Sequence, residues 1–181
     1  MIPIARPLIG DEEIAAVTRV LRSGWLMQGP EVEGFEQELA AYVGARHACV
    51  VSSGTAALHL ALLAAAVGPG EEVVTVSHSF IATANSIRLC GAVPVFIDIE
   101  PATFNIDPQL LDAAIGPRTR AVLVVHQLGM PCDLDAVGEV CRARGVILVE
   151  DAACALGSEH LSNGTWSRIG KPHGALACFS F

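Results

Sequence analysis

Short runs of consecutive apolar residues recur along this chain, and each is followed by a stretch with helical spacing. The clearest runs are VVTVS (73–77), VPVFID (93–98), AVLVVH (121–126) and VILVE (146–150). These runs are continuous rather than alternating, which is typical of strands that are buried on both faces. Strand–helix alternation of this kind predicts an α/β fold of three layers, with a mainly parallel sheet between two layers of helices.

The remaining elements follow from helix signals and from weaker apolar runs. Helices are expected over 11–24, 30–44, 55–67, 82–90, 107–115 and 134–145. Two more strands are expected over 48–52 and 175–181. Asp11 and Asp107 are the expected N-caps of their helices, because a short acidic side chain accepts bonds from free amides of the first turn.

Size and hydropathy place the chain among globular proteins. Its 181 residues suit one domain or most of a larger one. Apolar residues make up 52% of the sequence. No apolar run reaches the ~18 residues of a membrane span without a charge, Gly or Pro. We therefore assign the apolar excess to a heavily buried sheet, and we expect no membrane association.

Charge and cysteine usage exclude further classes. The net charge is −8 and the arginines are scattered, which argues against a nucleic-acid partner. The six cysteines show no CxxC spacing, and the N-terminus does not look like a signal peptide. Reduced core thiols in a cytoplasmic protein are expected. A zinc site from Cys132, Cys141 and a histidine is the alternative, without a recognisable spacing.

Ligands of parallel α/β sheets bind at the carboxyl ends of the strands. After the first strand, Gly54 and Thr55 open a long helix, whose free amides and positive dipole suit a phosphate. A plain helix N-cap is the alternative. The segment is neither a GxxxxGK[ST] loop nor a GxGxxG loop, which disfavours a nucleotide-binding domain.

Four more side chains follow strands of the predicted sheet. Phe80 either offers a flat face to a ring or packs in the core. Asp151 needs a partner if it is buried, and either a protonated ring nitrogen or the amides of the next turn would serve.

His126 is either a packed, hydrogen-bonded residue or a catalyst. Ser180 either joins Thr55 at a phosphate or is an ordinary serine at the end of a strand. A phosphate cradle, an aromatic plate and an acid for a ring nitrogen together describe a pocket for pyridoxal phosphate.

The same residues lie in longer motifs that carry a resemblance. These motifs include SSGTAALHLAL, GEEVVTVSHSFIATANSI, GAVPVFIDIEPATFNIDP, VHQLGMPCDLDAV and LVEDAACALGS. With them the chain resembles, from end to end, the DegT/StrS family of pyridoxal-phosphate-dependent sugar aminotransferases of fold type I. The resemblance implies that 47–181 is the large cofactor-binding domain, incomplete at its C-terminus, that 1–46 is its N-terminal helical segment, and that the small C-terminal domain is absent.

The resemblance also assigns roles to residues. It implies a cofactor-binding set of Gly54, Thr55, Ala56, Phe80, Asp151, Cys154 and Ser180. Asp151 is the catalytic member, because it pairs with the ring nitrogen. Cys154 stands where relatives often carry Gln or His, and a thiol is a weaker donor. The loop 23–30, which holds Trp25, is expected to border the sugar.

The position of the Schiff-base lysine is the main departure from the family. In the family it follows the Ser-Phe of the last strand by a few residues, so we expect it beyond Phe181. Lys171, the only lysine of the chain, precedes a strand that spans roughly 20 Å. We therefore expect Lys171 to be a solvated loop residue, and the 181-residue chain alone to be inactive.

The resemblance implies transfer of an amino group from glutamate or glutamine to a nucleotide-linked keto sugar, in polysaccharide or antibiotic-sugar synthesis, by a homodimer. Two alternatives stay open. One is a sugar dehydratase of the same scaffold, in which a histidine replaces the lysine. The other is a non-catalytic fragment or pseudo-enzyme.

Overall fold

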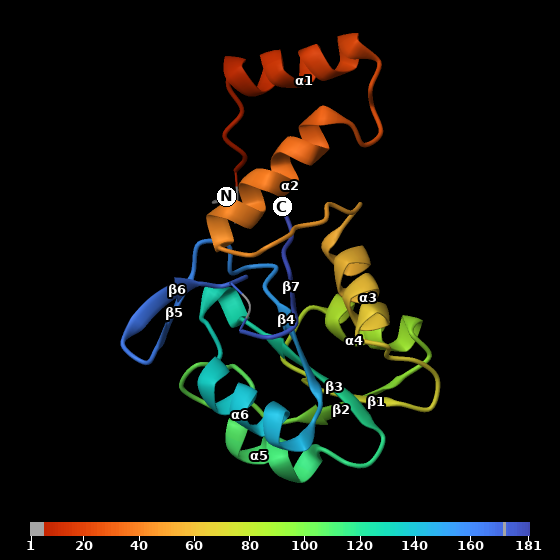
Figure 1. The fold of residues 1–181 in the computed structure, drawn as a ribbon, viewed down its shortest axis with the longest axis vertical. Helices are drawn as coiled ribbons and strands as arrows, with labels where there is room; N and C mark the ends of the chain where they lie inside the picture. Colours follow the sequence, from red (N-terminus) through yellow and green to blue (C-terminus); the bar gives the residue numbers. More distant parts are fainter. Residues whose placement is uncertain (1–5, 172) are drawn as a thin grey trace.

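A five-stranded sheet forms the centre of the protein. The computed structural model describes residues 6–171 and 173–181. The strand order is β2-β1-β3-β4-β7, and every neighbouring pair is parallel (Figure 1). The strands are β1 (Glu72–Val76), β2 (Val93–Ile97), β3 (Thr119–Val125), β4 (Ile147–Asp151) and β7 (Leu176–Cys178). The parallel sheet predicted from the continuous apolar runs is confirmed.

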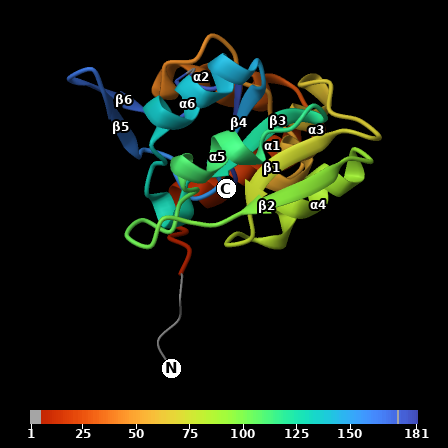
Figure 2. The same ribbon diagram turned by 90° about the horizontal axis from the view of Figure 1, so that it is seen from below.

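Helices cover both faces of this sheet (Figures 1 and 2). One layer holds α3 (Gly54–Ala64) and α4 (Ile81–Leu89), and the other holds α5 (Pro108–Ala114) and α6 (Leu134–Arg144). On β3, Leu123 packs with the α3–α4 layer, whereas Val122 and Val124 pack with the α5–α6 layer. Successive strand residues point to opposite faces, so a strand buried on both sides must be apolar throughout. The predicted three layers are confirmed.

Side-chain caps fix where several helices begin. Asp107 Oδ1 accepts from the Gln109 amide at 2.9 Å, which confirms the predicted cap of α5. The predicted cap at Asp11 is wrong. Gly10 is the N-cap of α1 (Asp11–Ser23), and the Gly10 amide donates to Glu13 Oε2 at 2.7 Å. Asp11 instead lies in the first turn, where its charge complements the helix dipole.

The strand expected over 48–52 is not formed. These residues connect α2 (Pro30–Val43) to α3, and the Val50 amide donates to Glu36 Oε1 at 2.8 Å rather than to a neighbouring strand. A cavity lies between this segment and the edge strand β7. An apolar run without a partner strand in reach cannot form a ladder, whatever its β propensity.

The strand expected over 175–181 is shorter than predicted. Its ladder with β4 ends at the pair Asp151–Cys178, because β4 itself ends there. Ser180 and Phe181 continue beyond the sheet, and the Phe181 ring meets the Phe35 ring edge-on at 5.2 Å between centroids.

A hairpin that the sequence analysis missed projects from the body. Its strands are β5 (Glu159–Ser162) and β6 (Thr165–Arg168), which pair antiparallel. Asn163 and Gly164 connect them with φ angles of 49° and 76°, as a two-residue hairpin turn requires. The Asn-Gly pair is the signal that could have predicted it.

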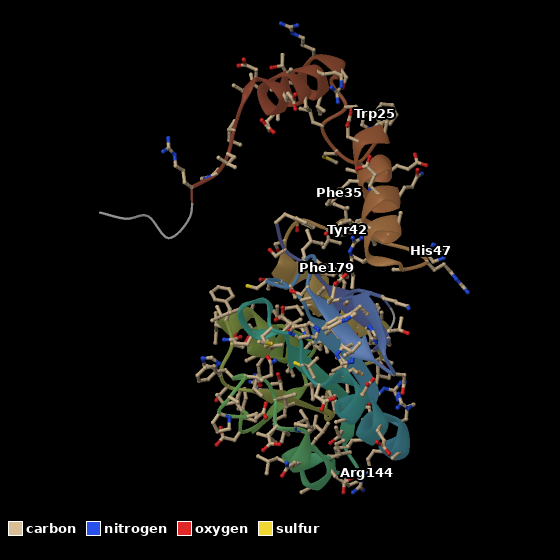
Figure 3. All side chains as sticks on the ribbon, turned by 90° about the vertical axis from the view of Figure 1, so that its left-hand side faces the viewer. Trp25, Phe35, Tyr42, His47, Arg144 and Phe179 are labelled. Carbon is tan, nitrogen blue, oxygen red and sulfur yellow. The ribbon has the colours of Figure 1, made fainter. Side chains whose placement is uncertain are left out.

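The first two helices form an arm that rises from the body (Figure 3). Helix α1 buries none of its residues, and its apolar side chains Ile14, Val17 and Leu21 are all more than half exposed. Helix α2 buries only Ala40 and Val43, so the arm contributes little to the core of the described chain.

Two matched substitutions test how unequal these packing environments are. Leu62→Ala, at a fully buried position, should lower the free energy of unfolding by about 2–5 kcal/mol. Leu21→Ala, at a position 60% exposed, should change it by less than about 0.5 kcal/mol. Urea unfolding monitored by circular dichroism measures both. Equal losses would show that α1 packs as tightly as α3.

Candidate functional site at the carboxyl edge of the sheet

Asp151 ends β4 with its carboxylate almost fully buried. Only 6% of the residue is exposed. Thr83 Oγ1 donates to Asp151 Oδ2 at 2.7 Å, and the Ala153 amide donates to Oδ1 at a longer 3.3 Å. No ion pair among the described residues includes Asp151. Two hydrogen bonds offset part of the desolvation, and the negative charge stays available to a cationic group.

Neighbouring strands place this carboxylate among other strand ends. In the sheet register Asp151 lies opposite Val125 of β3 and opposite Cys178 of β7. The His126 amide donates to the Asp151 carbonyl at 3.0 Å, and the Ala152 amide donates to the Cys178 carbonyl at 2.8 Å. The three strands therefore end at one level, and the residues that follow them form a common edge.

The buried thiol of Cys178 is affected by the negative charge at this edge. Burial and, to a smaller extent, the negative charges of Asp151 and Glu150 raise the pKa of Cys178 to about 12. Burial likewise raises the pKa of Cys132 to about 12 and that of Cys141 to about 11. These thiols are protonated at neutral pH and belong to the core.

The start of α3 meets the end of the chain at the same edge. A Cβ added at Gly54 would lie 3.0 Å from Ser180 Cβ and 3.1 Å from Ser180 Oγ. A side chain at position 54 would therefore crowd Ser180, and glycine avoids this. The N-cap is Ser53, whose Oγ accepts from the Ala56 amide at 3.1 Å. Gly54 and Thr55 thus begin the helix, while the Ala56 amide already has a protein partner.

Phe80 is not a core residue. It is the N-cap of α4 and is 77% exposed, so the interpretation as a packed core aromatic is wrong. Thr83 follows one helical turn later and contacts Asp151. An α-helix rises ~1.5 Å per residue, so Phe80 and Thr83 lie within one helical turn of each other at the start of α4.

Cys154 is exposed and lies in the turn that follows Asp151 and β4. The structure thus gathers most of the predicted cofactor set at the carboxyl edge of the sheet. Thr83 is the residue that sequence reasoning missed. Its signal is a hydroxyl in the first turn of a helix that follows a buried strand.

His126 is a packed, hydrogen-bonded residue, which is the first of the two interpretations given for it. It is 1% exposed, and its Nε2 lies 3.0 Å from Glu150 Oε2. The Cys132 amide donates to Nδ1 at 3.1 Å, so Nδ1 carries no proton and Nε2 must be the donor. The buried Glu150 carboxylate also accepts from the Gly174 amide at 2.8 Å. Through Glu150, the segment before β7 is hydrogen-bonded to β4 of the sheet.

Lys171 lies in the loop that precedes β7 and lines the same cavity as Gly54 and Ser180. It is exposed, and it precedes β7 in a segment whose Ala175 amide donates to the Leu148 carbonyl near the start of β4. Its side chain lies beside Gly44, at the end of α2. This placement agrees with the expectation of a solvated loop lysine.

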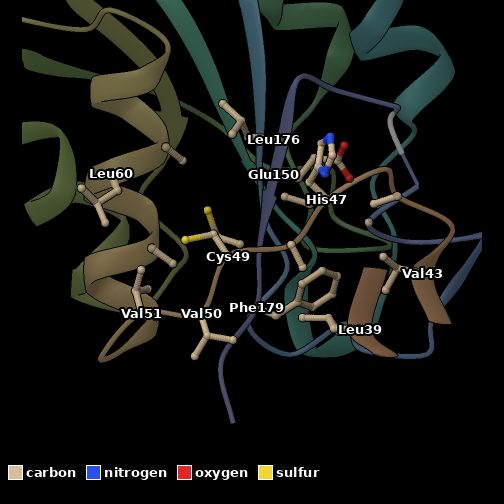
Figure 4. A pocket seen from close by; sticks show the side chains of 18 of the residues that line it. Leu39, Val43, His47, Cys49, Val50, Val51, Leu60, Glu150, Leu176 and Phe179 are labelled. Atoms are coloured by element: carbon tan, nitrogen blue, oxygen red, sulfur yellow. The ribbon is translucent and has the colours of Figure 1, made fainter. Parts of the chain in front are cut away.

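An apolar cavity of about 700 Å³ lies beside the edge strand β7 (Figure 4). Its walls come from α2, the segment 46–52, α3 and β7, with Leu39, Val50, Leu60 and Phe179 among the lining side chains. Gly54 and Ser180 border it, whereas Asp151 and Phe80 do not. The cavity therefore lies at the open edge of the sheet beside β7 rather than at the site around Asp151.

The described part of the chain offers neither a metal cluster nor a membrane-spanning helix. In residues 6–171 and 173–181, no group of three or more His, Cys, Asp or Glu side chains is arranged to hold a metal ion. Within the same residues, every helix is too short or too polar to cross a membrane.

Comparison with known families decides the relationship. The model of the DegT/DnrJ/EryC1/StrS aminotransferase family matches residues 7–181. The chain belongs to this family. Spore coat polysaccharide biosynthesis protein SpsC of Bacillus subtilis (strain 168) is 54% identical over 155 residues, which are 86% of this chain and 40% of SpsC.

Solved structures of the family share the fold. DesV of S. venezuelae, in complex with a ketimine intermediate, is 45% identical with a TM-score of 0.87 over 94% of this chain and 44% of DesV. The PLP-form of the putative sugar aminotransferase Spr1654 from Streptococcus pneumoniae is 32% identical with a TM-score of 0.90, over 99% of this chain and 48% of Spr1654. The chain thus spans less than half the length of these three relatives.

Thiol reactivity tests the layout of the site. Cys49 and Cys154 are exposed and the other four cysteines are buried. A thiol reagent at about pH 8 should therefore label two thiols fast, and all six only after unfolding, because thiolate is the reactive form. Pyridoxamine phosphate should slow the labelling of Cys154 but not of Cys49, as peptide mapping would show. Equal protection of both, or of neither, would contradict the placement of Cys154 at the cofactor.

Proposed function

We propose that this protein is the cofactor-binding part of a pyridoxal-phosphate-dependent aminotransferase that acts on a nucleotide-linked keto sugar. The observation that carries the proposal is the buried Asp151 carboxylate, which has hydrogen-bond donors but no ion-pair partner among the described residues. A buried negative charge of this kind suits a protonated pyridine nitrogen.

The residues at the edge of the sheet fit the cofactor. Gly54 and Ser180 approach so closely that a side chain at position 54 would fill the space between them. The helix start there supplies free amides and the positive end of a dipole for a phosphate. Thr55 adds a hydroxyl next to them, and the exposed Phe80 offers a free aromatic face.

We assign each of these residues a role in binding the cofactor. When bound, pyridoxal phosphate supplies an electron-withdrawing ring that stabilises negative charge beside the amino nitrogen. Asp151 holds a proton on the ring nitrogen, and Phe80 keeps the ring in place by stacking. Gly54, Thr55 and Ser180 bind the phosphate. We assign Ala56 a weaker part, because its amide is already bonded to Ser53.

The substrate and the assembly are inferred from the family. SpsC is by its name a polysaccharide biosynthesis protein, and Spr1654 a putative sugar aminotransferase. By analogy we propose a nucleotide-linked keto sugar as amino acceptor, glutamate or glutamine as donor, and a cytoplasmic homodimer. The loop 23–30 with Trp25, at the end of α2 away from the sheet (Figure 3), is expected to border the sugar.

A binding titration tests the cofactor assignment on the 181-residue chain. Pyridoxamine phosphate is the probe, because it has no aldehyde and needs no lysine to bind. Asp151→Asn should raise its Kd at least about tenfold, because the charged hydrogen bond to the ring is lost. Asp98→Asn is the matched control, since Asp98 also follows a strand, β2, but is exposed. Equal effects of the two changes would contradict the role of Asp151.

Borohydride reduction in the presence of pyridoxal phosphate tests the place of Lys171. Because Lys171 is an exposed loop residue that precedes β7 and lies beside Gly44, we expect no stoichiometric labelling of its peptide at low cofactor concentration. Stoichiometric labelling of Lys171 would show that this lysine reaches the cofactor aldehyde, and would contradict the placement described above.

A further inference from the structure

Thr83 occupies a position that the proposed reaction does not yet explain. It lies in the first turn of α4 and is 1% exposed. Its Oγ1 is 2.7 Å from Asp151 Oδ2 and 2.6 Å from Ser79 Oγ. Ser79 lies in the loop between β1 and α4, directly before Phe80. Two hydroxyls thus connect the aromatic residue of the site to its carboxylate.

The direction of the two hydrogen bonds follows from simple counting. An ionised carboxylate only accepts, so Thr83 must donate its single hydroxyl proton to Asp151. Thr83 Oγ1 then has lone pairs but no proton left for Ser79. Ser79 is therefore the donor in the second contact. The chain of donors runs from Ser79 to Thr83 to Asp151, and each bond polarises the next.

These two hydrogen bonds fix the orientation of the Asp151 carboxylate. Thr83 occupies Oδ2, whereas Oδ1 accepts from the Ala153 amide alone in the described chain, at 3.3 Å. Oδ1 therefore keeps acceptor capacity for a further donor. Threonine is β-branched and stiff at χ1, so its hydroxyl is held in place by the packing of its buried methyl group.

We propose that Thr83, supported by Ser79, is a positioning residue that holds the Asp151 carboxylate in the orientation needed for the ring nitrogen. This inference rests on the proposed function. Thr83 does not touch the cofactor. It acts by removing the rotational freedom of Asp151, so that the cofactor meets a carboxylate that is already oriented.

Three substitutions separate this role from plain packing. Thr83→Val keeps the shape and removes the hydroxyl, and it should weaken binding of pyridoxamine phosphate about tenfold. Thr83→Ser restores the hydroxyl and should stay within about threefold of the wild type. Thr75→Val is the matched control, because Thr75 is equally buried and its hydroxyl donates to the Leu123 carbonyl at 2.8 Å inside the sheet. It should leave the Kd unchanged within about twofold.

A double-mutant cycle identifies the partner. In an Asp151→Asn background, Thr83→Val should cost less than about twofold in Kd, because the oriented charge is already gone. A tenfold loss in that background, or an equal loss in Thr75→Val, would overturn the inference. If the wild type binds and Thr83→Val leaves the Kd unchanged, the inference about Thr83 fails while the proposed function stands. Absence of binding by the wild type would overturn the proposed function together with the inference.

Discussion

The hydrogen bond from Thr83 to Asp151 is the contact on which the geometry of the site depends. A carboxylate that is 6% exposed must find donors inside the protein. Because Asp151 ends β4 and Thr83 lies in the first turn of α4, which follows β1, the bond reaches across the end of β3. It can form only if β1, β3 and β4 are parallel and end at one level. The sheet order and the chemistry of the site therefore support each other.

Glu150, the second buried carboxylate of β4, has a structural role. Glu150 neighbours Asp151 on β4, and strand geometry sends the two side chains to opposite faces. Glu150 accepts from His126 and from the Gly174 amide, so its charge holds the segment before β7 to the sheet. Asp151 also has two donors, but the Ala153 amide lies a long 3.3 Å from Oδ1, which leaves acceptor capacity on that oxygen. The surroundings of two adjacent acids thus give Glu150 a structural task and leave Asp151 for the functional task proposed above.

The edge of the sheet at β7 is apolar and, in the described chain, unpaired. An apolar cavity of about 700 Å³ runs beside this strand, and the segment 46–52 lies on its far side without pairing. Exposed strand edges and apolar faces of this kind favour association with other polypeptide segments. Helix α1 likewise exposes apolar side chains. Both features agree with a chain that spans less than half the length of the relatives it matches.

Much of this architecture could be predicted from the sequence because its signals are local. Continuous apolar runs identified β1 to β4, and Asp107 identified the start of α5. Asp151 followed from a carboxylate at the end of a buried strand. The Thr83 contact could not be predicted, since it depends on which strands are neighbours. The failure at 48–52 has the same cause, because a strand needs a partner that the local sequence does not specify.

The protonation state of the bound ring nitrogen tests the account most directly. Nitrogen-15 NMR of ring-labelled pyridoxamine phosphate, bound to the 181-residue chain and titrated from about pH 7 to about pH 10, measures it. The account predicts that the bound nitrogen stays protonated at least about one pH unit higher than the free cofactor, because Asp151 stabilises the charged form. It also predicts that Asp151→Asn abolishes the difference. A bound nitrogen that titrates like the free cofactor in the wild-type chain would contradict the central role given to Asp151.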